Sequence, residues 1–276
     1  MTAVSLDRRA PVALSMVEGV GRATRLTLAA VGSTSRFVWA TVVAFRDVRT
    51  WAPQTLGQLR RLGVDSIPLG LFIAAFTGIV LALLASYSFT GAVPLYFVGT
   101  LVGKTITLEL AAVLTGLALA GRVGANIAAE LGTMRVTEQI DALETLAYDP
   151  IAYLVVPRVI AGTLMFPVIV AAAMMMGIGC GLVASATLLD LSSAQFIKGL
   201  RLYFQTFDVE YGLVKSASFG LAVTLVGARV GLRTAGGAVG VGRAATAAVV
   251  YSAVLILVID AFWAVTWLLG RAATAS

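Results

Sequence analysis

Four charged side chains lie in stretches of this sequence that are otherwise almost free of charge. Lys104 and Glu109 lie in one apolar stretch, at residues 97–120. Lys215 lies in a second such stretch and Asp260 in a third. An acidic residue at the centre of a bilayer costs about 2.5–3.5 kcal/mol, so it should face protein or a wet cavity. Glu109 therefore either makes a structural hydrogen bond between helices or forms the polar part of a translocation cavity, and its position favours neither.

The spacing of these residues predicts their partners. Lys104 precedes Glu109 by five residues, which separates the two side chains by about 140° around a helix and makes them poor partners. Lys215 lies near a helix end, where its long side chain can snorkel to the membrane surface. Asp260 lies deeper in its helix, which favours an ion pair with Lys or Arg of another helix.

Several kinds of chemistry are excluded by residue type. The chain has no histidine and a single cysteine, Cys180, which removes His/Cys metal sites, disulfide frameworks and His-dependent catalytic triads. The sequence GKT at 103–105 resembles the end of a phosphate-binding loop, but Val98 stands where the motif needs its first glycine. We therefore expect no catalytic residue, metal or cofactor here, and any ATP to be bound by another chain.

The elements that must position these residues are membrane-spanning helices. Of the 276 residues, 59% are hydrophobic and 12% are charged, against roughly 45–50% and 25% in soluble domains. About 20 apolar residues are needed to cross a bilayer. Five such stretches are predicted, at residues 67–89, 97–120, 159–189, 211–232 and 249–269.

The polar end of the chain is predicted to differ from the rest. Residues 1–65 carry nine arginines, and no apolar run of the signal-peptide type follows the start. The apolar stretch at 26–45 is interrupted by glycine, serine and arginine and is flanked by aromatic residues, which favours a helix in the membrane interface. We predict an all-α integral membrane protein, with an amphipathic interfacial segment (1–65) before a five-span transmembrane domain (66–276).

The distribution of Lys and Arg predicts the orientation. Fifteen of them fall in residues 1–65, 121–158 and 229–243, whereas the other side holds Lys198, Arg201 and Arg271. Because cytoplasmic loops carry the excess of positive charge, the N-terminus should be cytoplasmic and the C-terminus outside. Topology therefore explains the net charge of +6, and no nucleic-acid partner is needed.

The stretch between the second and third spans predicts a protein interface. Its apolar residues recur at helical spacing, at Met134, Val136, Ile140, Leu143 and Ala147, and Asp149-Pro150 should end the helix. Residues 121–158 hold five acidic residues and three arginines. Because an acidic face is repelled by anionic lipid, this amphipathic helix suits docking to a protein partner better than resting on the membrane.

The same stretch carries a family resemblance. The run AGRVGANIAAELGTMRVTEQIDALETLAYDPIAYLVVPR, residues 120–158, closely resembles the signature of the MlaE/YrbE family. These proteins are permease subunits of ATP-binding-cassette (ABC) lipid transporters linked to MCE proteins. Three further stretches agree: LELAAVLTGLALAGR (108–122), LVKSASFG (213–220) and GGAVGVGRAATAAVVYSAVLILVIDAF (236–262). The resemblance covers nearly all of residues 60–270.

The resemblance implies an assembly in the bacterial inner membrane. Two permease chains, expected here as a homodimer, form the membrane core over a cytoplasmic ABC ATPase dimer that holds ATP and Mg. An MCE-domain protein lies on the outer side, and Gram-negative members add a STAS-domain protein. A phospholipid pocket lies at the permease interface and opens outward.

It also implies roles for individual residues. The coupling helix that inserts into the ATPase matches Thr137–Glu144, with Arg135, Thr137, Glu138, Gln139, Asp141 and Glu144 as its polar residues. The lipid site matches Leu81, Ser88, Phe89, Ala92, Glu109 and Lys215. Arg243 and Asp260 match polar positions at the start of and within the last span. Leu108 stands where many members have arginine, and Ala111-Ala112 replaces Gly-Pro.

Other functions stay open beside a lipid-transport permease. A stand-alone proton-coupled secondary transporter would use Glu109 and Asp260 as proton carriers, but such folds are built from repeats, and five spans do not divide into equal halves. A membrane enzyme acting on lipids would need Glu109, Asp260 or Lys215 for acid–base work, without a nucleophile motif. A purely structural anchor for an MCE protein is the remaining alternative.

Overall fold

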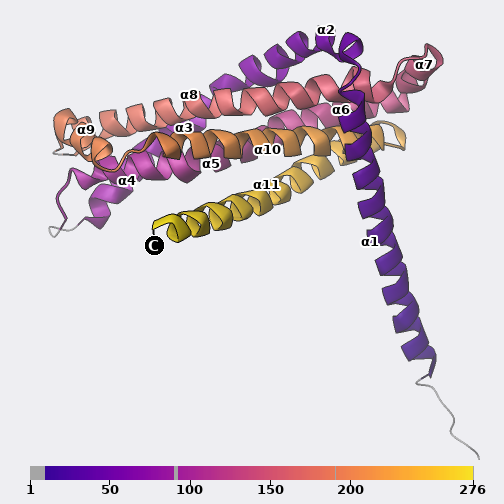
Figure 1. Ribbon diagram of the computed structural model, residues 1–276, viewed down its shortest axis with the longest axis horizontal. Helices are drawn as coiled ribbons and strands as arrows, with labels where there is room; N and C mark the ends of the chain where they lie inside the picture. Colours follow the sequence, from indigo (N-terminus) through magenta and orange to yellow (C-terminus); the bar gives the residue numbers. More distant parts are fainter. Residues whose placement is uncertain (1–9, 90–92, 190, 276) are drawn as a thin grey trace, which may run out of the picture. The chain divides into compact units, whose positions relative to one another are not determined.

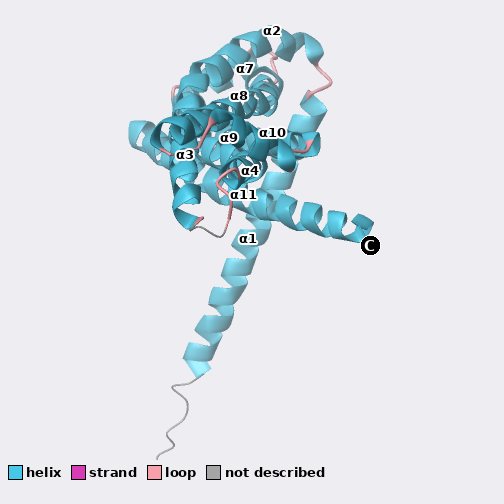
Figure 2. Ribbon diagram, turned by 90° about the vertical axis from the view of Figure 1, so that its left-hand side faces the viewer, coloured by secondary structure: helices cyan, strands magenta, loops and turns pink. Residues whose placement is uncertain are grey.

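The computed structural model describes residues 10–89, 93–189 and 191–275. The described residues form helices and loops, with no strand among them (Figure 2). The chain divides into two compact units, Met1–Arg46 and Asp47–Ser276. The first contains α1 (Ala10–Ala44), which extends further toward the N-terminus than the predicted helix at 26–45. The interfacial location of α1 stays a prediction.

The second unit is a bundle of five helical runs that are long and apolar enough to cross a membrane, as predicted. The first run consists of α2 (Val48–Gln58) and α3 (Ile67–Ser88), and the second of α4 (Phe97–Thr105), α5 (Ala111–Leu119) and α6 (Ala125–Val136). The other three runs contain one α-helix each: α8 (Val156–Leu188), α10 (Thr206–Leu232) and α11 (Gly237–Ala275). The short helices α7 (Gln139–Thr145) and α9 (Ser193–Leu202) lie at opposite ends of this bundle (Figure 1). The second unit begins at Asp47, and its first helix, α2, packs along α8.

Several runs are not regular α-helix throughout. Segments of π-helix, with their wider turns, occur at Leu59–Gly63, Ile106–Leu110, Ala120–Gly124 and Ile151–Val155. Two of them interrupt the second span, between α4 and α5 and between α5 and α6. Single turns of π-helix inside α-helices are frequent at functional sites, and Glu109 lies in the first of these two.

Small residues bring the helices of the bundle into backbone contact. A Cβ added at Gly78 of α3 would lie 1.9 Å from the carbonyl oxygen of Gly177 in α8, and one at Gly220 of α10 would lie 2.3 Å from that of Gly162. A Cβ at Gly227 of α10 would lie 2.9 Å from the carbonyl oxygen of Gly124. In lipid, where close packing rather than water exclusion holds helices together, these crossings fix the bundle.

The tightest crossing in the first span gives a stability prediction. Gly78→Ala is expected to lower the free energy of unfolding by about 1–3 kcal/mol, because the added methyl group has to push α3 away from α8. Gly179→Ala on α8 is the matched control, since nothing lies within 4 Å of its added Cβ. Thermal unfolding in one detergent compares the two, and equal midpoints would contradict the close crossing.

Candidate functional site

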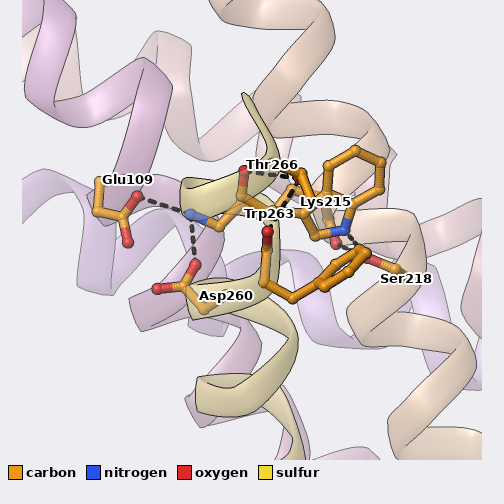
Figure 3. Close-up of polar contacts among 7 residues, drawn as sticks. Glu109, Lys215, Ser218, Asp260, Trp263 and Thr266 are labelled. Carbon is orange, nitrogen blue, oxygen red and sulfur yellow. Dashed lines mark hydrogen bonds and ion pairs between the residues drawn. The ribbon is translucent and has the colours of Figure 1, made fainter. Parts of the chain in front are cut away.

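Three charged side chains from three spans meet inside the bundle. Lys215 of α10 is fully buried, and its Nζ donates to Oε2 of Glu109 at 2.6 Å. The same Nζ forms an ion pair with Oδ1 of Asp260 on α11. Figure 3 shows the lysine reaching between the two carboxylates. We call these residues the charge triad, and the interhelical partner predicted for Asp260 is confirmed as Lys215.

The members of the charge triad differ in how far a guest molecule can reach them. The side chain of Lys215 is 0% exposed and that of Asp260 is 17% exposed, whereas that of Glu109 is 42% exposed. Lys215 does not snorkel to a surface; burial between two carboxylates satisfies its charge instead. Two carboxylates share one ammonium, so the ionised triad carries an excess negative charge whose accessible part is the carboxylate of Glu109.

Aromatic side chains lie beside the charge triad, near the start of α10 and in the C-terminal part of α11. The Lys215 Nζ lies 5.3 Å from the centre of the Tyr211 ring, which allows a cation–π interaction. Trp263 Nε1 donates to Ser218 Oγ at 3.0 Å (Figure 3), and the rings of Tyr211 and Trp267 contact each other at a tilt, with centres 4.9 Å apart. The sequence did not predict Tyr211, Ser218, Trp263 or Trp267 as site residues. The spacing of Asp260, Trp263 and Trp267 on one helical face was the available signal.

Three of the predicted tail-lining residues, Leu81, Ser88 and Phe89, lie in the second half of α3 or at its end. Phe89 follows α3 and lines a shallow groove of about 350 Å³ whose walls are mainly apolar. Leu81 is half-buried on α3, and exposed Ser88 donates to the carbonyl of Leu84 at 2.8 Å. Ala92 lies outside the described residues. The lining of this groove includes Phe89 but neither Leu81, Ser88 nor a member of the charge triad.

A second ion pair borders the same groove. Lys104 of α4 lines it, and its Nζ lies 2.5 Å from Oδ2 of Asp208 in the first turn of α10. Asp208 is buried, and the same oxygen accepts from the backbone N–H of Gln205 at 3.2 Å. Lys104 and Glu109 were correctly predicted not to pair, but the partner of Lys104 was not foreseen.

The predicted coupling helix differs from its expected form. The helix was expected over Thr137–Glu144, but α6 ends at Val136 and α7 covers Gln139–Thr145. Thr137 and Glu138 form the turn between them, and Glu138 has a φ of 59°, in the left-handed region. Continuous apolar spacing from Met134 onward had suggested one helix, but a left-handed residue breaks its direction.

The polar residues of this element are not all available to a partner. Arg135 Nη1 lies 2.5 Å from Oδ1 of Asp141, so this pair joins α6 to α7 within the chain. Glu138, Gln139 and Glu144 are exposed. Ile140 is buried and holds α7 against the bundle. The surface therefore keeps two acidic groups, Glu138 and Glu144, outside the internal ion pair.

The end of this element also departs from expectation. Asp149-Pro150 was expected to end the amphipathic helix, but α7 ends earlier, and Ala147 has a φ of 61°. Asp149 instead accepts the backbone N–H of Ile151 at 2.9 Å and so begins the third span. Leu146 and Tyr148, which were not predicted, are exposed apolar side chains beside the acidic ones.

An ion-pair network ties the same end of the bundle together. Buried Arg158 of α8 contacts Glu130 of α6 through Nη2 at 3.0 Å and donates to the carbonyl of Leu154. Glu130 also pairs with Arg61 at 3.2 Å. Arg243, predicted as a polar residue of the last span, is exposed near the start of α11 and has no ion pair with another described residue.

Comparison with known proteins adds a family to this geometry. A family model described as "Permease MlaE" matches residues 55–266. A probable ABC transporter permease protein of Rickettsia felis is 40% identical over 245 residues, covering 89% of this chain and 95% of the relative. One of Synechocystis is 41% identical over 215 residues, covering 78% and 81%. The chloroplastic protein TRIGALACTOSYLDIACYLGLYCEROL 1 of Arabidopsis thaliana is 34% identical over 206 residues, covering 75% and 59%.

Proposed function

Because this chain belongs to the MlaE permease family, we propose that it moves phospholipid between the membrane and an MCE-protein conduit. The coarser function follows from the family itself: the chain is a multi-pass permease of an ABC-type transporter, which works with an ATPase partner. The proposal concerns the guest, the outer partner and the residues that carry out the movement.

The observation that carries the proposal is the partly exposed carboxylate of Glu109 in an apolar span. A charged group in a bilayer faces protein or a polar guest, and Glu109 is both paired with Lys215 and accessible. A carboxylate accepts hydrogen bonds, so it suits a headgroup that offers ammonium or hydroxyl donors. A separate apolar groove, lined by Phe89 and by Lys104 of α4, would suit acyl chains. The name of the Arabidopsis relative, which refers to a diacylglycerol lipid, supports a lipid guest.

The motor and the other partners complete the proposal. Two identical permease chains would form the lipid pocket between them, over an ABC ATPase dimer that alone binds ATP and Mg. The chain itself would catalyse no reaction. The acidic surface of α7 would dock on the ATPase, an MCE-domain protein would receive or deliver the lipid, and a STAS-domain protein would bind the ATPase. The inner membrane is the proposed location, with α7 on the cytoplasmic side.

Two measurements test this function. Native mass spectrometry of the assembly extracted from its own membrane should show two permease chains, two ATPase chains and retained phospholipid. In proteoliposomes, the assembly should transfer fluorescent phospholipid to an acceptor only while ATP is hydrolysed, and an ATPase subunit unable to hydrolyse ATP is the control. Lipid transfer by the permease alone, driven by a proton gradient, would contradict the proposal and favour the secondary transporter.

A further inference from the structure

The helix α9, at the end of the bundle opposite α7, carries a surface whose lining includes no member of the charge triad. One of its faces is fixed against α4: Phe196 is fully buried, and a Cβ added at Gly199 would lie 1.7 Å from the carbonyl oxygen of Tyr96. Thr100 of α4 donates to the carbonyl of Gly199 at 2.5 Å. With this face held by backbone contacts, the opposite face must point away from the bundle.

The outward face of α9 combines cations with apolar side chains. Ala194, Ile197, Lys198, Arg201 and Leu202 follow helical spacing and line a shallow hollow of about 560 Å³. Among the described residues, neither Lys198 nor Arg201 has a carboxylate within ion-pair distance. Lys198 Nζ lies 5.4 Å from the centre of the Tyr96 ring, which helps to hold it in place.

The position of α9 sets it at a membrane surface. Residues 189–192 join it to the end of α8, and residues 203–205 join it to the start of α10. Because an extended chain spans at most about 3.6 Å per residue, α9 cannot leave the level at which both spans end. Tyr203 and Phe204, which follow it, are exposed aromatic residues, and aromatic and basic residues together mark the interface between lipid and water.

We propose that the outward face of α9 is a binding site for the phosphate of anionic phospholipid headgroups, with Lys198 and Arg201 as the cationic ligands. Ile197 and Leu202 would rest on the acyl chains below the headgroup. Cations without a carboxylate partner in the described part of the chain, beside apolar side chains and at the height of the span ends, match an anionic lipid in both charge and polarity. The site does not depend on lipid movement through the charge triad, so a permease inactive in transport should keep it.

Photo-crosslinking tests the site in the full-length chain. The protein is reconstituted in vesicles of equal phosphatidylglycerol and phosphatidylcholine, with a trace of either lipid carrying a photoreactive group near its headgroup. Crosslinks to the α9 peptide are counted by mass spectrometry. Each cation near an anionic surface contributes about fivefold, so phosphatidylglycerol should label α9 at least fivefold more than phosphatidylcholine.

Substitutions separate this site from general attraction to positive charge. Lys198→Gln with Arg201→Gln should remove the preference, and Lys198→Arg should keep it. Arg122→Gln with Arg233→Gln removes the same charge from exposed positions outside α9 and should leave labelling of α9 unchanged. Equal labelling by both lipids would overturn the proposal, as would an unchanged preference in the double variant. Crosslinks from α9 to a protein partner in place of lipid, in the extracted assembly, would overturn it too.

Discussion

Lys215→Met is expected to lower the free energy of unfolding by about 3 kcal/mol and to abolish lipid transfer. The substitution leaves Glu109 and Asp260 without the ammonium group that both of them contact. Breaking a buried ion pair by removing one partner costs about 3–5 kcal/mol, and the lower end applies because Glu109 is 42% exposed. Thermal unfolding in detergent measures stability, and ATP-dependent transfer in proteoliposomes measures function.

Two further variants separate stability from transport. Glu109→Gln leaves Lys215 and Asp260 as a one-to-one pair, so stability should change little while transfer falls about tenfold through the loss of a charged hydrogen-bond acceptor for the headgroup. Glu109→Gln, Lys215→Met and Asp260→Asn together remove all three charges. This neutral variant should regain most of the stability, because replacing a whole buried ionic group is close to neutral, and it should stay inactive. A stable, active Lys215→Met protein would contradict the role of the charge triad.

Glu138→Lys combined with Glu144→Lys is expected to reduce ATP-dependent transfer at least tenfold without destabilising the permease. Both side chains are exposed, and neither pairs with another described residue. Reversing their charge changes the surface with which α7 is proposed to dock on the ATPase, and like charges placed across an interface weaken association strongly. The measurements are lipid transfer, stimulation of ATP hydrolysis and assembly by native mass spectrometry.

The geometry of α7 determines the controls for this experiment. Reversing Asp141 alone would break its internal pair with Arg135, whereas Arg135→Asp with Asp141→Arg exchanges the charges and can keep the pair. Glu138→Gly removes the carboxylate but accepts the positive φ at this position, so it tests charge without backbone strain. Normal transfer and assembly in the Glu138→Lys, Glu144→Lys variant would exclude α7 as the coupling element.

The five spans could be predicted because hydrophobicity over about 20 residues is a strong local signal. The same uniform hydrophobicity gives no information on the local helix geometry or on side-chain directions within a span. Around Glu109 nearly every neighbour is apolar, so periodicity cannot reveal a π-helical segment or the direction in which the carboxylate points. At Glu138, the pattern of apolar residues predicted a continuous helix, and no local feature announced the left-handed turn.

The sequence could predict that a charged residue in one span pairs with a residue of another span, but not which residue that is. Asp260 required a partner from another helix, but sequence could not choose Lys215 among the basic residues. The Lys104–Asp208 pair joins positions 104 residues apart, and Arg158 was counted as one cytoplasmic charge although it is buried against Glu130. Such contacts depend on how the helices pack, and short local patterns do not encode that choice. The structure therefore brings Glu109, Lys215 and Asp260 together, whereas their role toward a lipid stays a prediction.

The glycine crossings described above limit where movement can occur. At Gly78–Gly177, Gly162–Gly220 and Gly124–Gly227 the backbones themselves touch, so no side chain between them can change rotamer to let one helix rotate past the next. Rearrangement inside such a bundle would separate several helix pairs at once. The bundle should therefore tilt as a rigid body with its hinge outside it, and in the proposed dimer a lipid would enter and leave by a gap that opens between the two chains.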